Sequence, residues 1–158
     1  MSASRMPIFG LGAAAFIACG AVLATSQPVR AAEVLITDAE AKLPPLKGAI
    51  ASASRGITRG PRVELVDTGT DGSIHSPMHL QLKFQAFGGA KVDPSAVQVV
   101  YLKSPEVDLT DRVKPFVQAS GIDMPEAVLP PGDHVLRVDV KDTDGRTGTT
   151  SFTLKVAP

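Results

Sequence analysis

The sequence of 158 residues has no tryptophan, no asparagine, a single cysteine and only 4% aromatic residues. Few aromatic rings argue against a module that stacks sugars on its surface. Sixteen basic side chains balance sixteen acidic ones, without a run of lysine or arginine. Nucleic-acid binding and electrostatic membrane anchoring need clustered basic side chains, so both classes are disfavoured. Glycine and proline are plentiful, with 14 and 13 residues, which favours many turns and short strands over long helices.

Residues 1–31 have the three-part layout of a secretory signal peptide. One positive charge lies in residues 1–5, residues 7–24 are apolar without a charged side chain, and small residues follow. Cleavage after Ala31 fits the small-residue pattern, and cleavage after Ser26 is an alternative. The sequence therefore predicts an exported protein, periplasmic or secreted, with no membrane insertion after cleavage.

Cleavage changes the charge and the cysteine content of the chain. Arg5 and Arg30 leave with the leader and no acid does, so the mature chain carries 14 basic against 16 acidic side chains. Cys19 leaves as well, which makes disulfide bonds unavailable. The stretch Phe16–Gly20 is similar to a bacterial lipoprotein box, so a lipid anchor through Cys19 is the alternative to a free mature protein.

Residues 32–60 show no sustained hydrophobic period. They are rich in Ala, Ser, Gly and Pro with scattered basic residues. Such a composition predicts a flexible tether, in which a short helix could form over residues 38–42.

From residue 61 onward, apolar and polar residues alternate with the period of two that is typical of half-buried antiparallel strands. In residues 78–86 every even position is apolar and every odd position is polar. The pattern predicts about seven strands, over residues 62–66, 78–86, 97–103, 107–113, 127–129, 135–141 and 150–156.

Turn residues separate the predicted strands. Asp144-Gly145 lies between the last two, and Asp-Gly is the strongest short hairpin signal, so these two strands are expected to be neighbours. Gly88-Gly89 and Pro130-Pro131-Gly132 mark other junctions. Short strands with turns between them predict an all-β fold, an immunoglobulin-like antiparallel β-sandwich over residues 61–158.

One segment carries a family resemblance. Residues 129–147 (LPPGDHVLRVDVKDTDGRT) resemble the closing hairpin of bacterial immunoglobulin-like domains, and Ser76-Pro77 before the strand at Met78 resembles their second strand. The resemblance covers roughly residues 61–157. It implies a fold more than a role, because domains of this group serve as adhesion, spacer or accessory modules of exported proteins.

The same ending is similar to that of small periplasmic copper-resistance carriers. Those proteins use a histidine at or near the mature N-terminus and another in an Asp-Gly-His turn. Here the mature start has no histidine and the turn ends in Arg146, which stays protonated and cannot bind a cationic metal.

A second copper hypothesis comes from the stretch His75-Ser76-Pro77-Met78-His79. Two imidazoles and a thioether suit copper. Strand parity, however, puts Met78 in the core and His79 on the outside, with His75 in the preceding turn, so the ligands are expected to be separated.

Acidic turns suggest calcium, a hard cation that prefers several oxygen ligands. In an immunoglobulin-like sandwich, Asp93 would lie at the same end as Asp142 and Asp144. This trio is the candidate calcium site, although Asp is also a preferred turn residue.

Catalytic motifs are absent from the sequence, which has no Gly-x-Ser-x-Gly, no His-Glu-x-x-His and no phosphate-binding loop. The chain is therefore predicted not to be an enzyme and to need no cofactor. His134 shares the parity of Leu136 and is expected at the rim of the core, hydrogen-bonded to a neighbouring loop.

The remaining hypothesis is a binding or structural module that engages a protein partner in the cell envelope, with a metal-binding protein as the alternative. Val100 and Leu102 face away from the core parity of their strand, so something should cover them. If a partner covers them, they belong to its binding site; if the tether does, that argument disappears.

Overall fold

The computed structural model describes residues 32–48, 60–66 and 74–158. The predicted signal peptide lies outside the described residues. The elements in chain order are β1 (Glu33–Val34), α1 (Asp38–Ala41), β2 (Arg62–Leu65), β3 (Met78–Gln85), η2 (Pro94–Ala96), β4 (Gln98–Tyr101), β5 (Val107–Asp108), α2 (Thr110–Val113), η3 (Lys114–Phe116), β6 (Val117–Gln118), β7 (Gly121–Val128), β8 (Gly132–Lys141) and β9 (Thr147–Val156).

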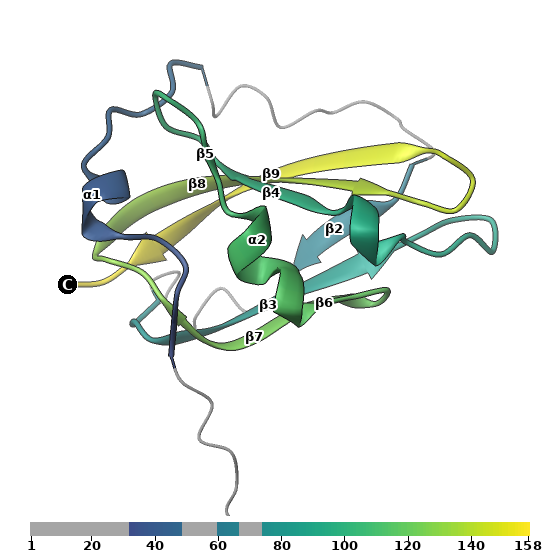
Figure 1. The fold of residues 1–158 in the computed structure, drawn as a ribbon, viewed down its shortest axis with the longest axis horizontal. Coiled ribbons are helices and arrows are strands. Elements are labelled where there is room, and N and C mark those ends of the chain that lie inside the picture. The colour runs from purple at the N-terminus through teal and green to yellow at the C-terminus, as the bar shows by residue number, and fades with distance from the viewer. Residues whose placement is uncertain (1–31, 49–59, 67–73) are drawn as a thin grey trace, which may run out of the picture.

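Two sheets pack face to face (Figure 1). The five-stranded sheet has the order β1-β7-β3-β2, with β6 also paired to β7, and the four-stranded sheet has the order β5-β4-β8-β9. All pairs are antiparallel except β1 with β7. The prediction of an all-β sandwich is confirmed, and the described residues contain nine strands because two short segments, β1 and β6, add to the expected seven.

The core lies between the sheets and is built by the alternating positions. In β3 the buried side chains are Met78, Leu80, Leu82 and Phe84, and in β8 they are His134, Leu136, Val138 and Val140. β8 and β9 pair along their whole length, from Gly132 with Val156 to Lys141 with Thr147, which confirms that the last two strands are neighbours.

The strand predicted over residues 107–113 is only partly a strand. β5 ends at Asp108, whose carboxylate accepts a hydrogen bond from Thr110 N at 2.8 Å, and α2 follows. Leu109 and Val113 are both fully buried, and their spacing of four residues places them on one side of a helical turn. The prediction failed because two apolar residues four apart fit either period.

β7 is longer than the strand predicted over residues 127–129. It begins at Gly121 and contains Pro125, which cannot donate a hydrogen bond to a ladder. The register with β3 shifts near this proline: Leu80 faces Met124, whereas Met78 faces Ala127. A bulge tolerates a proline inside a strand, and its irregular pattern hid the strand from the period-two analysis.

Residues 32–48 pack on the sandwich, so the prediction of a tether over residues 32–60 is wrong for this part; residues 49–59 lie outside the described residues. Leu35 and Ile36 are 0% and 1% exposed and belong to the core. Both of their backbone N–H groups donate to Val128 O, at 3.0 and 3.4 Å. We call residues 33–46 the N-terminal strap. It contains α1, and Figure 1 shows α1 at one end of the sandwich.

The strap reaches from one sheet to the other. Its start pairs with β7, and its end lies beside the residues that follow β4, where Ser104 N donates to Pro44 O at 2.9 Å and Leu46 N to Leu102 O at 3.4 Å. Between these ends, Thr37 and Glu40 form a capping box that starts α1.

Candidate functional site

The hairpin between β8 and β9 holds two of the predicted calcium ligands. Its loop has three residues, Thr143 to Gly145, rather than the two that Asp-Gly suggests, and Gly145 has the positive φ of 80° that this loop type requires. The carboxylate of Asp142 is fully buried. Its Oδ1 accepts the backbone N–H groups of Asp144 and Arg146, at 3.1 and 2.8 Å.

Arg146 occupies the space between the two acidic side chains. Its Nε donates to Asp142 Oδ2 at 2.9 Å, and its Nη2 donates to Asp144 Oδ2 at 2.5 Å and to Phe87 O at 3.0 Å. Burial disfavours the charged form of Asp142, but hydrogen bonds from the backbone and guanidinium of Arg146 outweigh it and lower the pKa of this carboxyl. The guanidinium therefore takes the position that a cation between these carboxylates would need.

Asp93 does not join this pair through its side chain. Its carboxylate accepts hydrogen bonds from Ser95 N at 2.9 Å and Ser95 Oγ at 2.7 Å, and these lower its pKa. Only its backbone contacts the hairpin, through a hydrogen bond to Lys141 O. In the part of the chain that the structure describes, no three His, Cys, Asp or Glu side chains are grouped to hold a metal ion.

Replacing Arg146 with methionine is expected to lower the melting temperature by about 10 °C or more. The change removes the side-chain partner of a buried carboxylate, and an unpaired buried charge is strongly destabilising. Thermal unfolding followed by circular dichroism measures the effect.

Arg137→Met is the matched control. Arg137 pairs with Glu106 and Asp139, but all three side chains are between 31% and 43% exposed, and exposed ion pairs contribute little. Equal losses for the two variants would contradict the special role of Arg146. So would a rise in the melting temperature of the unaltered protein on addition of calcium.

The candidate copper ligands are separated as their parity predicts. Met78 is 6% exposed and lies in the core, whereas His79 is exposed on the outer face of the five-stranded sheet. His79 Nε2 lies 2.5 Å from Asp123 Oδ1 on the neighbouring strand β7. His75 is exposed in the segment before β3. The structure thus pairs His79 with a carboxylate and does not bring it together with Met78.

His134 lies deeper than the rim position expected for it, with 2% exposure. Its Nε2 is 2.7 Å from Pro130 O, which is the predicted bond to a neighbouring loop, and its Nδ1 is 2.8 Å from the hydroxyl of Tyr101. Burial, with a smaller effect of Glu40, raises the pKa of Tyr101 to about 12. Lys103 Nζ lies 5.2 Å from the centre of the Tyr101 ring.

Leu102 is covered, so its apolar side chain does not argue for an open partner site. It is 3% exposed, and the strap is hydrogen-bonded beside it, from Leu46 N to Leu102 O and from Ser104 N to Pro44 O. The segment expected to be a tether therefore lies next to Leu102. Val100 stays half-buried on the outer face of the four-stranded sheet, opposite Arg137 on β8.

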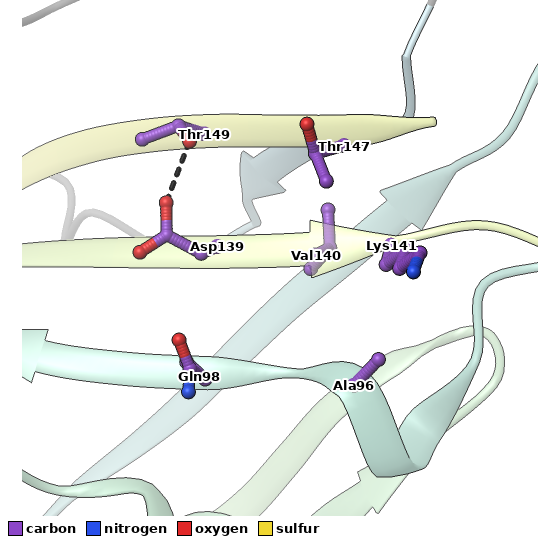
Figure 2. A pocket seen from close by; sticks show the side chains of 7 residues that line it. All are labelled: Ala96, Gln98, Asp139, Val140, Lys141, Thr147 and Thr149. Carbon is purple, nitrogen blue, oxygen red and sulfur yellow. Dashed lines mark hydrogen bonds between the residues drawn. The ribbon is translucent and has the colours of Figure 1, made fainter. Parts of the chain in front are cut away.

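The outer face of the four-stranded sheet also carries a shallow polar dish of about 390 Å³ (Figure 2). It spans β4, β8 and β9 and is lined by Ala96, Gln98, Asp139, Val140, Lys141, Thr147 and Thr149. Figure 2 shows Gln98, Asp139 and Thr149 in one row across the strands, with Thr149 Oγ1 donating to Asp139 Oδ1 at 2.6 Å.

Sequence reasoning missed this dish. Its polar residues are outward positions of β4, β8 and β9, and only the pairing of Gln98 with Asp139 and of Asp139 with Thr149 brings them together. The available signal was the parity of these positions, which also fits an ordinary solvated face.

Comparisons with known proteins add one structural likeness. The chain is similar to the crystal structure of CopC from Methylosinus trichosporium OB3b, with a TM-score of 0.39 and 20% sequence identity over 61% of this chain and 95% of that one. No protein-family model and no curated protein matches the chain. The resemblance to bacterial immunoglobulin-like domains stays a prediction. No helix among the described residues is long and apolar enough to cross a membrane.

Proposed function

We propose that this chain is an exported, non-catalytic binding module that engages a protein partner in the cell envelope through the outer face of its four-stranded sheet. The polar dish on that face carries the proposal. It offers an amide, two hydroxyls, an ammonium and a carboxylate, supplied by Gln98, Thr147, Thr149, Lys141 and Asp139.

The shape of the dish favours a protein over a small molecule. Small-molecule sites are concave and mostly apolar, and they enclose most of the ligand. The dish lies open on a sheet face instead, with Gln98 exposed on β4 and with Thr147 and Thr149 exposed on β9. Non-obligate protein interfaces are about as polar as the rest of the surface and contain many hydrogen bonds.

Its charges also support this interpretation. Asp139 is already paired with Arg137, whose Nε donates to its Oδ2 at 3.1 Å, and its Oδ1 accepts a hydrogen bond from the hydroxyl of Thr149. The carboxylate is therefore a poor candidate for a metal ligand. Val100 lies two residues after Gln98 on the same outer face and adds apolar area beside the polar groups. A polar surface with an apolar border suits a reversible protein contact.

Cross-linking in the exported form tests the proposal. The full-length chain with a C-terminal tag is produced with its own leader, and partners in the envelope fraction are captured by a short cross-linker. Gln98→Arg is expected to reduce capture of the main partner at least tenfold, because a bulky charge fills the dish.

Gln118→Arg is the matched control. Gln118 is also an exposed glutamine but lies on β6, in the five-stranded sheet. Both variants should keep the melting temperature of the unaltered protein. Equal loss of capture in the two variants would overturn the choice of face, and failure of the unaltered protein to reach the envelope fraction or to capture a partner would overturn the function.

A further inference from the structure

The ring of His134 has a defined partner on each nitrogen. Pro130 O can only accept, so Nε2 carries the hydrogen and donates to it at 2.7 Å. Nδ1 then accepts from the hydroxyl of Tyr101 at 2.8 Å. This arrangement satisfies both nitrogens only while the ring is neutral, and the side chain is 2% exposed.

The two segments that His134 joins are the ones that hold the N-terminal strap. Pro130 lies two residues after Val128, and the carbonyl of Val128 accepts the N–H groups of Leu35 and Ile36. Two residues after Tyr101 comes Lys103, whose Nζ donates to Ala41 O at 2.9 Å. One buried histidine therefore links the attachment of the strap to each of the two sheets.

We propose that His134 is a proton-sensitive latch for the N-terminal strap, so that protonation of its ring weakens the attachment of residues 33–46 while the β8–β9 hairpin stays folded. This inference does not rest on the proposed function.

Protonation disturbs the attachment beside Tyr101, whereas the Nε2–H bond to Pro130 O is kept. A proton on Nδ1 turns this nitrogen into a donor, so the Tyr101 hydroxyl has to rotate its own hydrogen away into a buried region. The new charge also repels Lys103, which holds the strap and lies over the Tyr101 ring. Release of the strap lets water reach the imidazolium and relieves this repulsion.

The other charged groups nearby do not cancel the effect. Asp133 attracts the protonated ring, but its side chain is on the exposed side of β8. Glu40 is already held by Arg112 through bonds of 2.7 and 2.8 Å. Burial, assisted by Lys103, outweighs Asp133 and the Pro130 bond and lowers the pKa of His134.

The lowered pKa of His134 sets the direction in which strap opening depends on pH. The closed strap holds a histidine of depressed pKa, and release of the strap moves this pKa back toward the ordinary histidine value of about 6.5. The closed form is therefore favoured fully above this value and loses its advantage as the pH falls. Between pH 6.5 and the lower value, the opening constant rises about tenfold per pH unit because one proton is taken up.

Hydrogen exchange tests the latch. The full chain is followed between pH 7.5 and 5, and protection factors are calculated relative to the unstructured rate at each pH. The strap amides of Leu35, Ile36, Ala41 and Leu46, which are all hydrogen-bonded, are expected to lose protection about tenfold per pH unit below 6.5, whereas the β8–β9 amides keep theirs.

Two variants separate the latch from other causes. His134→Gln should remove the slope, because its side chain does not titrate. Tyr101→Phe should raise the pH at which the loss of protection levels off, because it removes the donor that favours the neutral ring in the closed form. Glu40 cannot produce the slope, since the hydrogen bond from Arg112 lowers its pKa to about 2.

A flat profile in the unaltered protein, or an equal loss of protection in the hairpin, would overturn the latch. The same slope in His134→Gln would do so as well. If His134→Gln fails to fold, the direction of the shift in Tyr101→Phe decides, and a shift to lower pH counts against the proposal.

Discussion

A chain that begins at residue 47 is expected to unfold at a clearly lower urea concentration than a chain that begins at residue 32. The shorter chain lacks Leu35 and Ile36, which are 0% and 1% exposed in the core. Removing a buried aliphatic side chain costs about 2–5 kcal/mol, and the whole domain has only about 5–15 kcal/mol of stability. Urea unfolding followed by circular dichroism measures the difference.

Point variants show whether the buried side chains are the cause. Ile36→Ala is expected to cost about 3 kcal/mol. Val34→Ala, in the same segment, should stay within about 0.5 kcal/mol, because Val34 is 45% exposed and its truncation leaves no cavity. A chain from residue 47 with an unchanged unfolding midpoint would restore the tether hypothesis.

The strap could not be read from the sequence because its stability comes from distant contacts. Leu35 and Ile36 are only two apolar residues, too few to show a period. The carboxylate of Glu40 accepts a hydrogen bond from Arg112, which is 72 residues away in the sequence. Arg112 also donates to Leu35 O at 2.8 Å. Short elements gain most of their stability from tertiary packing, and local composition does not contain that information.

The central strands were predictable for the opposite reason. Each of them has one buried and one solvated face, so apolar and polar residues alternate along its sequence, as in Met78–Gln85. Register along β8 and β9 follows from the same alternation, because a slip of one residue would turn the buried side chains toward solvent.

The candidate site shows what local patterns leave out. The sequence places Asp142, Asp144 and Arg146 within five residues, and it excludes the arginine as a metal ligand. It does not show that the three-residue loop turns this arginine back onto both carboxylates. Parity did predict that His134 points inward, while its bond to Tyr101 depends on the pairing of β8 with β4.

Gly60 and Gly148 lie where β2, at the edge of the five-stranded sheet, approaches β9, at the edge of the four-stranded sheet. A Cβ added to Gly148 would lie 1.8 Å from Pro61 O, and one added to Gly60 would lie 2.2 Å from Thr147 O. Both obstacles are backbone atoms, so no side chain can move aside. The two residues therefore mark a contact between the edges of the two sheets that only glycines permit.

Gly148→Ala is accordingly expected to cost about 3 kcal/mol or more, seen as a fall of more than about 10 °C in melting temperature. Thr153→Ala, at an exposed position of the same strand, should change it by only a few degrees. Because Gly60→Ala strains the same contact, the double variant should cost less than the sum of the single variants. Full additivity would mean that the two glycines do not share one contact. An unchanged melting temperature for Gly148→Ala would mean that the sheet edges can separate at this point without loss, and the sandwich would then be held together by its core and its strap alone.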